Sequence, residues 1–143
     1  MRGEYTTALP LATTWHQHWH DTLGPDDDHT LWAASQLANA HQLLGHYQRA
    51  RRLDEDTLAR RRRVLGDDHP NTLSSAHNLA IHLSMVGEHE QARQLDQDTL
   101  ARYRRVLGDD HPNTLRSAHN LAITLRALGL HEQARRLDED SAR

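Results

Sequence analysis

Two nearly identical phrases decide the fold of this chain. Residues 65–73 read LGDDHPNTL and recur unchanged at residues 107–115, and SAHNLAI at residues 75–81 recurs at residues 117–123. Between residues 65–101 and 107–143, 26 of 37 aligned positions are identical. Self-similarity at a fixed period, here 42 residues, indicates an array of stacked supersecondary units rather than one closed globule.

The same period extends over the rest of the chain. Residues 23–64 form a looser copy, in which glycines and alanines recur at the same spacing: Gly45, Gly87 and Gly129, and Ala50, Ala92 and Ala134. Ala8 and Leu11 also match Ala50 and Leu53. We predict a single array over residues 1–143. It has a half repeat at 1–22 that holds only a second helix, repeat 1 at 23–64, repeat 2 at 65–106, and repeat 3 at 107–143, truncated in its second helix.

Each copy contains two amphipathic helix patterns. In repeat 2, apolar residues recur at spacings of three and four over residues 70–86, which is typical of one helix face. Asp68 or His69 can cap this helix, and Gly87 can end it in the left-handed conformation. A second pattern covers about residues 88–106. Because so few residues link the two helices, we predict antiparallel neighbours and an all-α fold.

These residues resemble a known family. The Gly-x-His/Tyr-x-x-Ala elbow, preceded by Leu-Ala, is similar to the tetratricopeptide repeat. The 42-residue length and the LG-x-D-H-P-x-T-L…NLA phrase resemble its kinesin-light-chain type, and LDEDTLARRRRVLGDDHP resembles the tandem repeats of actinobacterial regulators. The resemblance implies a right-handed superhelical solenoid of antiparallel helix pairs. Its first helices would line a concave groove that binds a protein or peptide.

The resemblance also implies which residues of the first helices form the peptide-binding site. They are Trp32, Gln36, Asn39 and Gln42 in repeat 1; Ser74, His77, Asn78, Ile81 and Met85 in repeat 2; and Arg116, His119, Asn120, Ile123 and Arg126 in repeat 3. Repeats 2 and 3 differ at several of these positions, which favours divergence of a binding site over free drift of solvated helix faces. For the amides at 36, 78 and 120, peptide binding and structural bridging between helices are equal alternatives.

One acidic position departs from the family pattern. Asp54, Asp96 and Asp138 stand where such repeats usually hold a large aromatic residue, on or beside the packing face. A buried carboxylate without a partner would be costly, so we predict that each pairs with an arginine of a neighbouring helix. A catalytic cluster is the weaker alternative, because a 42-residue spacing places the three in successive layers. With no nucleophile elbow, acid–base motif or phosphate loop, we predict no enzyme and no cofactor.

Three other clusters invite a functional interpretation. His16 and His20 are spaced to chelate a metal from one helical turn, although we predict no metal site. The run from Arg60 to Arg63 could contact nucleic acid, but nearby acids favour a solvated, locally neutralised surface. Trp15 and Trp19 share one helix face, where core packing is the default and partner contact is the alternative.

The bulk composition favours a protein partner. The 17 basic residues are all arginine, against 20 acidic residues, and a formal charge of −3 argues against nucleic acid or an anionic membrane as the partner. The chain has no cysteine, long apolar run or signal-peptide core, which predicts a cytoplasmic protein. We expect a fragment of a larger regulatory protein. The alternative is a structural module that self-associates through the apolar faces of its exposed ends.

Overall fold

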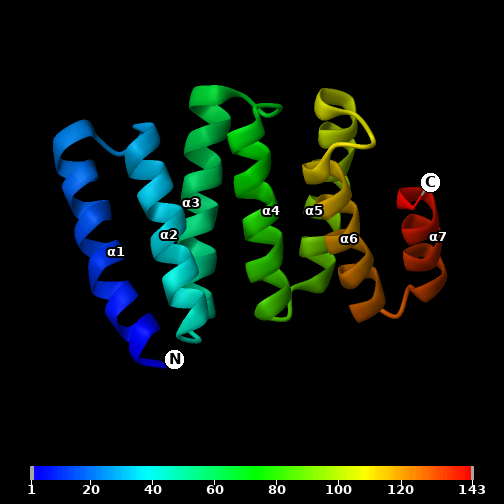
Figure 1. The fold of residues 1–143 in the computed structure, drawn as a ribbon, viewed down its shortest axis with the longest axis horizontal. Helices are drawn as coiled ribbons and strands as arrows, with labels where there is room; N and C mark the ends of the chain where they lie inside the picture. The colour runs from blue at the N-terminus through cyan, green and yellow to red at the C-terminus, as the bar shows by residue number, and fades with distance from the viewer. Residues whose placement is uncertain (1, 143) are drawn as a thin grey trace. The chain divides into compact units, whose positions relative to one another are not determined.

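The computed structural model describes residues 2–142, with side chains from Ala8 onward, and every regular element in that range is an α-helix (Figure 1). The chain forms two compact units, residues 1–67 and residues 68–143. The boundary falls close to the predicted junction of repeats 1 and 2. None of the described helices is long and apolar enough to cross a membrane.

The first unit contains the predicted half repeat and repeat 1. Its helices are α1 (Arg2–Leu23), α2 (Asp28–Leu43) and α3 (Tyr47–Leu65), and α2 packs against both of the others. The core of α2 is built largely from alanine, with Leu31 and Leu37 also buried. Small side chains suffice because each layer of a solenoid is thin.

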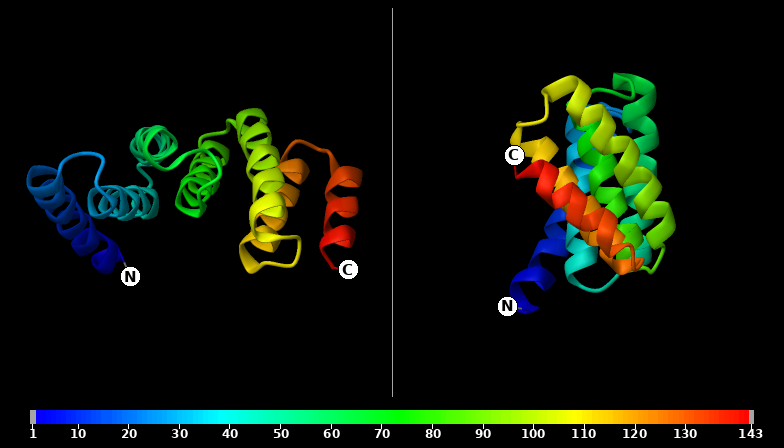
Figure 2. Two further views of the ribbon diagram at one scale, coloured as in Figure 1. Left: turned by 90° about the horizontal axis from the view of Figure 1, so that it is seen from above. Right: turned by 90° about the vertical axis from the view of Figure 1, so that its right-hand side faces the viewer.

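The second unit contains repeats 2 and 3. Its helices are α4 (Pro70–Met85), α5 (His89–Leu107), α6 (Pro112–Ala127) and α7 (His131–Ser141). Each helix packs against the next along the chain (Figure 2). Helix α4 also contacts α6. The core cluster between α5, α6 and α7 consists of Leu100, Ala118, Leu121, Ala122, Leu125 and Ala134. The predicted all-α solenoid of helix pairs is therefore confirmed.

Histidine caps the first helices of repeats 2 and 3. Of the two residues predicted as caps in repeat 2, Asp68 and His69, it is His69 that takes this role. The Nδ1 atom of His69 accepts a hydrogen bond of 3.1 Å from the backbone N–H of Asn71, and His111 repeats this geometry with Asn113. In repeat 1 the same position is Asp27, whose Oδ1 accepts from the N–H of His29 at 2.9 Å. Each cap satisfies one of the N–H groups that a helix start leaves without a partner.

A glycine turn reverses the chain between the two helices of each pair. After α4, the N–H of Gly87 donates to the carbonyl of Ser84 and the N–H of Glu88 donates to the carbonyl of Leu83, at 3.1 and 2.8 Å. These two bonds form a Schellman motif, which requires the positive φ of 86° that Gly87 adopts. The tight turn makes the second helix an antiparallel neighbour of the first.

The arginine run of α3 is neutralised at its surface, as predicted, except at one residue. Arg60 donates to Asp56 at 2.8 Å and to Asp26 at 2.9 Å, and Arg63 donates to Asp26 at 2.8 Å. Arg61 was expected to be solvated together with its neighbours, and that expectation is wrong, since it is buried. Four successive helical residues point in four directions, so one of them necessarily faces the packed side of α3.

Candidate binding site

Three of the predicted binding residues on α2 line one cavity in the first unit. Trp32, Gln36 and Asn39 face Leu11 and Trp15 of α1 across a cavity of about 320 Å³. The remaining lining residues are alanines and one leucine: Ala8, Ala12, Ala33, Ala40 and Leu43. We call this space the α1–α2 groove. It contains two neutral amides and no charged side chain, so it suits an apolar ligand segment with a few hydrogen-bonding groups.

The α1 side of this groove was only partly visible in the sequence. Trp15 is 51% exposed, so the interpretation of Trp15 as a core residue is wrong. Its ring stacks on Trp19 at a centroid separation of 6.0 Å. Leu11 was not predicted as a binding residue. The repeat period aligns Leu11 with Leu53, but a single sequence does not show that Leu11 is exposed.

The two histidines of α1 that are spaced to chelate a metal lie close together. The rings of His16 and His20 are one turn apart, with centroids separated by 6.1 Å. Burial and the neighbouring His20 lower the pKa of His16. A lowered pKa keeps the His16 imidazole neutral over a wider pH range.

The predicted residues of α4 are mostly half-buried. Ser74, His77, Asn78 and Ile81 are partly accessible, and Met85 is exposed. Burial, reinforced by the charge of Arg116, lowers the pKa of His77 to about 4. His77 is therefore a neutral group at physiological pH that can donate and accept one hydrogen bond.

The predicted residues of α6 are mostly exposed. Arg116, His119, Ile123 and Arg126 are all exposed. Arg116 donates to the amide oxygen of Asn113 at 3.0 Å. This partner is neutral, so the contact does not pair the guanidinium charge with a carboxylate. Arg126 instead forms an ion pair with Asp138 of α7.

Asn120, the remaining predicted residue of α6, is held by a buried carboxylate. Its Nδ2 donates to Oδ1 of Asp96 on α5 at 3.0 Å, and the Thr124 hydroxyl donates to Oδ2 at 3.0 Å. The Thr124 oxygen also lies 3.2 Å from the Asn120 carbonyl. Asn120 therefore bridges two helices, which is the structural one of the two alternatives given for the amides.

At Asp96, this network corrects the prediction that each aspartate of the acidic position pairs with an arginine. Asp96 is bonded to a neutral amide and a hydroxyl, because the face of α6 opposite it carries short uncharged side chains. Burial raises the pKa of Asp96 to about 6, although the two hydrogen bonds act in the other direction. The prediction is correct at Asp138, which pairs with Arg126.

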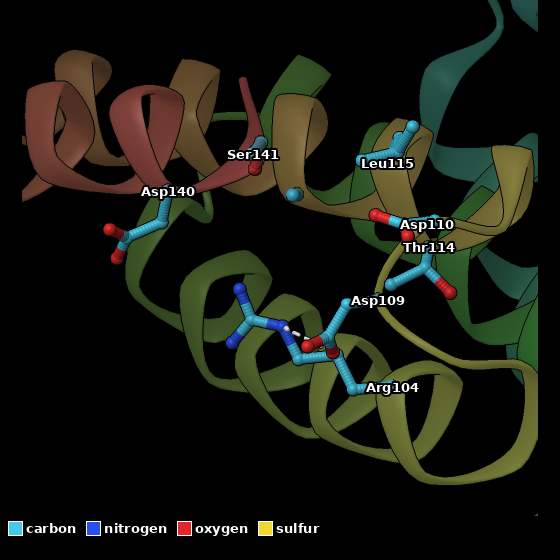
Figure 3. Close-up of a pocket in the computed structure, with 8 residues that line it drawn as sticks. Arg104, Asp109, Asp110, Thr114, Leu115, Asp140 and Ser141 are labelled. Carbon is cyan, nitrogen blue, oxygen red and sulfur yellow. Dashed lines mark ion pairs between the residues drawn. The ribbon is translucent and has the colours of Figure 1, made fainter. Parts of the chain in front are cut away.

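A second cavity, of about 390 Å³, lies where α6 meets the end of α7 (Figure 3). It was not predicted. Leu115 lines it and is 37% exposed, whereas its equivalent Leu73 is 1% exposed. Helix α5 continues through Leu107, whereas α7 is described to Ser141, the equivalent of Thr99.

Acidic side chains surround this second cavity. Asp109, Asp110 and Asp140 line it, and Arg104 approaches Asp109 at 3.9 Å (Figure 3). Two copies facing each other through this surface would bring their carboxylates together, which disfavours such a symmetric pairing. Self-association through the end faces stays a prediction.

Comparison with known proteins supports the family suggested by the repeat. Models described as tetratricopeptide repeat match residues 30–71 and residues 76–143. No curated protein matches the chain.

Several solved structures of repeat proteins have the same fold as this chain. Two of them are structures of a kinesin-light-chain-type protein of Podosopora anserina with nearly identical TPR-like repeats, and one of the two is of a substituted variant. They superpose on 99% of this chain with TM-scores of 0.87 and 0.84, and their sequences are 28% and 29% identical to it. BtubC (BKLC) from P. vanneervenii superposes over 98% with a TM-score of 0.86 at 16% identity, which shows a shared fold. This chain spans 66%, 67% and 56% of those chains, respectively. The chain belongs to the tetratricopeptide repeat family.

Proposed function

We propose that this protein is a scaffold that binds another protein or a peptide through the exposed faces of its first helices. Tetratricopeptide repeats are in general protein-interaction scaffolds. The observation that carries the proposal is the exposure of large apolar side chains at the positions predicted for ligand contact. Trp32 on α2, Met85 on α4 and Ile123 on α6 are 57%, 45% and 51% exposed. Exposed apolar side chains grouped with polar ones are typical of interaction sites.

The α6 face indicates what part of the ligand binds there. Arg116, His119 and Ile123 are spaced by three and four residues, so they share one side of the helix. We propose that Ile123 contacts an apolar side chain of the ligand and that Arg116 pairs with a carboxylate next to it. Arg116 suits this role because its hydrogen bond to Asn113 leaves the guanidinium charge available.

A protein ligand fits the charge of the chain better than nucleic acid. The formal net charge is −3, and several arginines of the second helices are already paired with carboxylates, such as Arg60 with Asp56 and Arg102 with Asp98. Phosphate binding would require a continuous basic surface. We therefore propose that the partner is a polypeptide.

Capture of partners from the source lysate, followed by mass spectrometry, tests the proposal with matched variants. Ile123→Glu places a charge on the proposed face, and Val106→Glu places the same charge on an exposed valine of the second helix α5. We expect Ile123→Glu to abolish recovery of a partner that the wild type and Val106→Glu retain. Circular dichroism and thermal unfolding confirm that both variants are folded. Equal recovery by all three proteins would refute the assignment of the binding face.

A further inference from the structure

The turn between α2 and α3 is a Schellman motif that begins and ends on a histidine. The N–H of His46 donates to the carbonyl of His41 at 2.7 Å, and the N–H of Gly45 donates to the carbonyl of Gln42 at 3.0 Å. Gly45 adopts the positive φ of 81° that the motif requires. His41 and His46 therefore stand at the two positions whose side chains an apolar contact usually joins across such a turn.

Repeat 3 has apolar residues at the equivalent positions. Two periods along the chain, His41 and His46 correspond to Leu125 and Leu130. The N–H of Leu130 donates to the carbonyl of Leu125 at 2.8 Å, so the turn is of the same type. Leu125 belongs to the core cluster of the second unit, and Leu130 packs against that cluster. Repeat 1 thus carries two titratable rings where repeat 3 carries two side chains that no change of pH affects.

The two histidine rings meet nitrogen to nitrogen. Nδ1 of His41 lies 3.1 Å from Nδ1 of His46, and the ring centroids are 5.4 Å apart. Because the centroids are so much farther apart than the nitrogens, each Nδ1 lies close to the line that joins the two rings. One nitrogen can donate its N–H along this line to the lone pair of the other, as a hydrogen bond requires. A metal ion held by both rings would instead need the two lone pairs to converge on a third point.

This hydrogen bond depends on how many protons the pair carries. A neutral imidazole has one N–H and one lone pair, so two neutral rings form the bond with one donor and one acceptor. A pair with one added proton keeps the bond, because the accepting ring still has its lone pair. When both rings are protonated, both Nδ1 atoms are donors, so the bond is lost and two positive charges face each other.

The surroundings of the pair oppose the uptake of protons. Burial lowers the pKa of His41, and the charges of His46 and Arg49 act in the same direction, against the C-terminal end of the α2 dipole. His46 stands at the N-terminus of α3, where the helix dipole also disfavours a positive charge. The described residues of α1 that face α2 across the α1–α2 groove carry no titratable group: Ala8, Leu11, Ala12 and Trp15.

We infer that the α2–α3 turn is a pH-sensitive contact, closed by the hydrogen bond between His41 and His46 in neutral solution and opened in mildly acidic solution, when both rings take up a proton. The sign follows from the lowered pKa of His41 in the folded protein. The contribution of the pair to stability is fully present above the ordinary value of 6.5 and is lost as the pH falls below it. The start of α3 should then loosen from the end of α2, while the leucine turn of repeat 3 stays closed.

Amide hydrogen exchange measured by NMR at pH 7.5 and pH 5 tests the inference. The reporters are the N–H groups of Gly45 and His46 in the α2–α3 turn. The equivalent turn of repeat 3, read at Gly129 and Leu130, is the control within the same molecule. After correction for the intrinsic pH dependence of exchange, we expect protection in the α2–α3 turn to fall roughly fivefold or more at pH 5. Protection in the control turn should change by less than about twofold.

Two variants separate the histidine pair from other causes. His41→Leu combined with His46→Leu copies the turn of repeat 3, and protection at Gly45 should then be the same at both pH values. His46→Glu copies Glu88, the equivalent residue of repeat 2, and places a carboxylate beside His41. Protection should rise rather than fall at pH 5 in this variant, because protonated His41 gains a counter-charge.

Circular dichroism confirms that the variants are folded. Equal protection of the wild-type α2–α3 turn at the two pH values would overturn the inference. A loss of protection at pH 5 that persists in the double leucine variant, or in His46→Glu, would overturn it as well, because neither protein contains two histidines that can repel each other.

Discussion

Replacing Asp96 by asparagine should stabilise the protein at neutral pH. The side chain is 1% exposed and touches a neutral amide and a hydroxyl, and burial raises its pKa from 3.8 to about 6. Ionising such a carboxyl in the folded protein rather than in the unfolded chain costs about 3 kcal/mol, because each pKa unit corresponds to about 1.4 kcal/mol. Asparagine removes the charge without changing the shape of the side chain.

The surrounding hydrogen bonds can accept this substitution. The amide oxygen of an asparagine at position 96 would accept from Asn120 as the carboxylate does. Its NH₂ group would donate to the Thr124 oxygen, and the Thr124 hydroxyl would then donate to the Asn120 carbonyl, 3.2 Å away. Asparagine therefore resembles the protonated form of Asp96, and every partner keeps a hydrogen bond.

The sign and size of the effect depend on pH. The folded protein binds the Asp96 proton more tightly than the unfolded chain does, so stability falls as pH rises from about 4 to about 6. Asp96→Asn abolishes this loss. We expect the variant to exceed the wild type in free energy of unfolding by about 3 kcal/mol at pH 7 and by about 1 kcal/mol at pH 4.5.

Urea unfolding of both proteins at the two pH values provides the assay. His77 contributes a pH dependence of opposite sign in the same range, and the difference between variant and wild type removes it. Asp98→Asn, which alters an exposed carboxylate of the same helix, is the control and should change stability by less than about 0.5 kcal/mol. A gain that is equal at both pH values, or a less stable Asp96→Asn at pH 7, would refute the reasoning.

Two further predictions concern histidines. Because burial lowers the pKa of His77 from 6.5 to about 4, its contribution to stability should be fully present above pH 6.5 and lost as pH falls toward 4, and NMR titration should find its ring neutral at pH 5; a midpoint near 6.5 would contradict this. His111→Ala should lower the free energy of unfolding by about 1 kcal/mol, because the N–H of Asn113 loses its cap, and His111→Asp should restore it. The natural precedent is Asp27, and equal stability of the two variants in urea unfolding would show that the cap contributes little.

Local features of this fold were predictable from the sequence because they depend on neighbours in the chain. The cap at His69 and the turn at Gly87 each need a few adjacent residues in a set conformation, and the repeat shows those residues more than once. The ion pair between Asp98 and Arg102 is local in the same way, because the two residues are four apart in one helix. None of these features depends on which helix lies alongside.

Features that depend on the neighbouring helix were not predictable. The period assigns Arg61 and Tyr103 to one buried position, but composition alone suggested that Arg61 would face water. Similarly, the packing side of Asp96 was foreseen and its partners were not, because α6 could have presented an arginine there. A period identifies equivalent positions, while the side chains opposite them come from another part of the repeat.

The α1–α2 groove shows how a repeat protein can acquire a distinct site without new backbone geometry. The fold places Trp15 and Ala12 where Thr99 and Asp96 stand in a covered layer, so substitution at equivalent positions is enough to change the surface. The alanine removes a carboxylate that would require polar partners, and the tryptophan adds exposed apolar area to the groove.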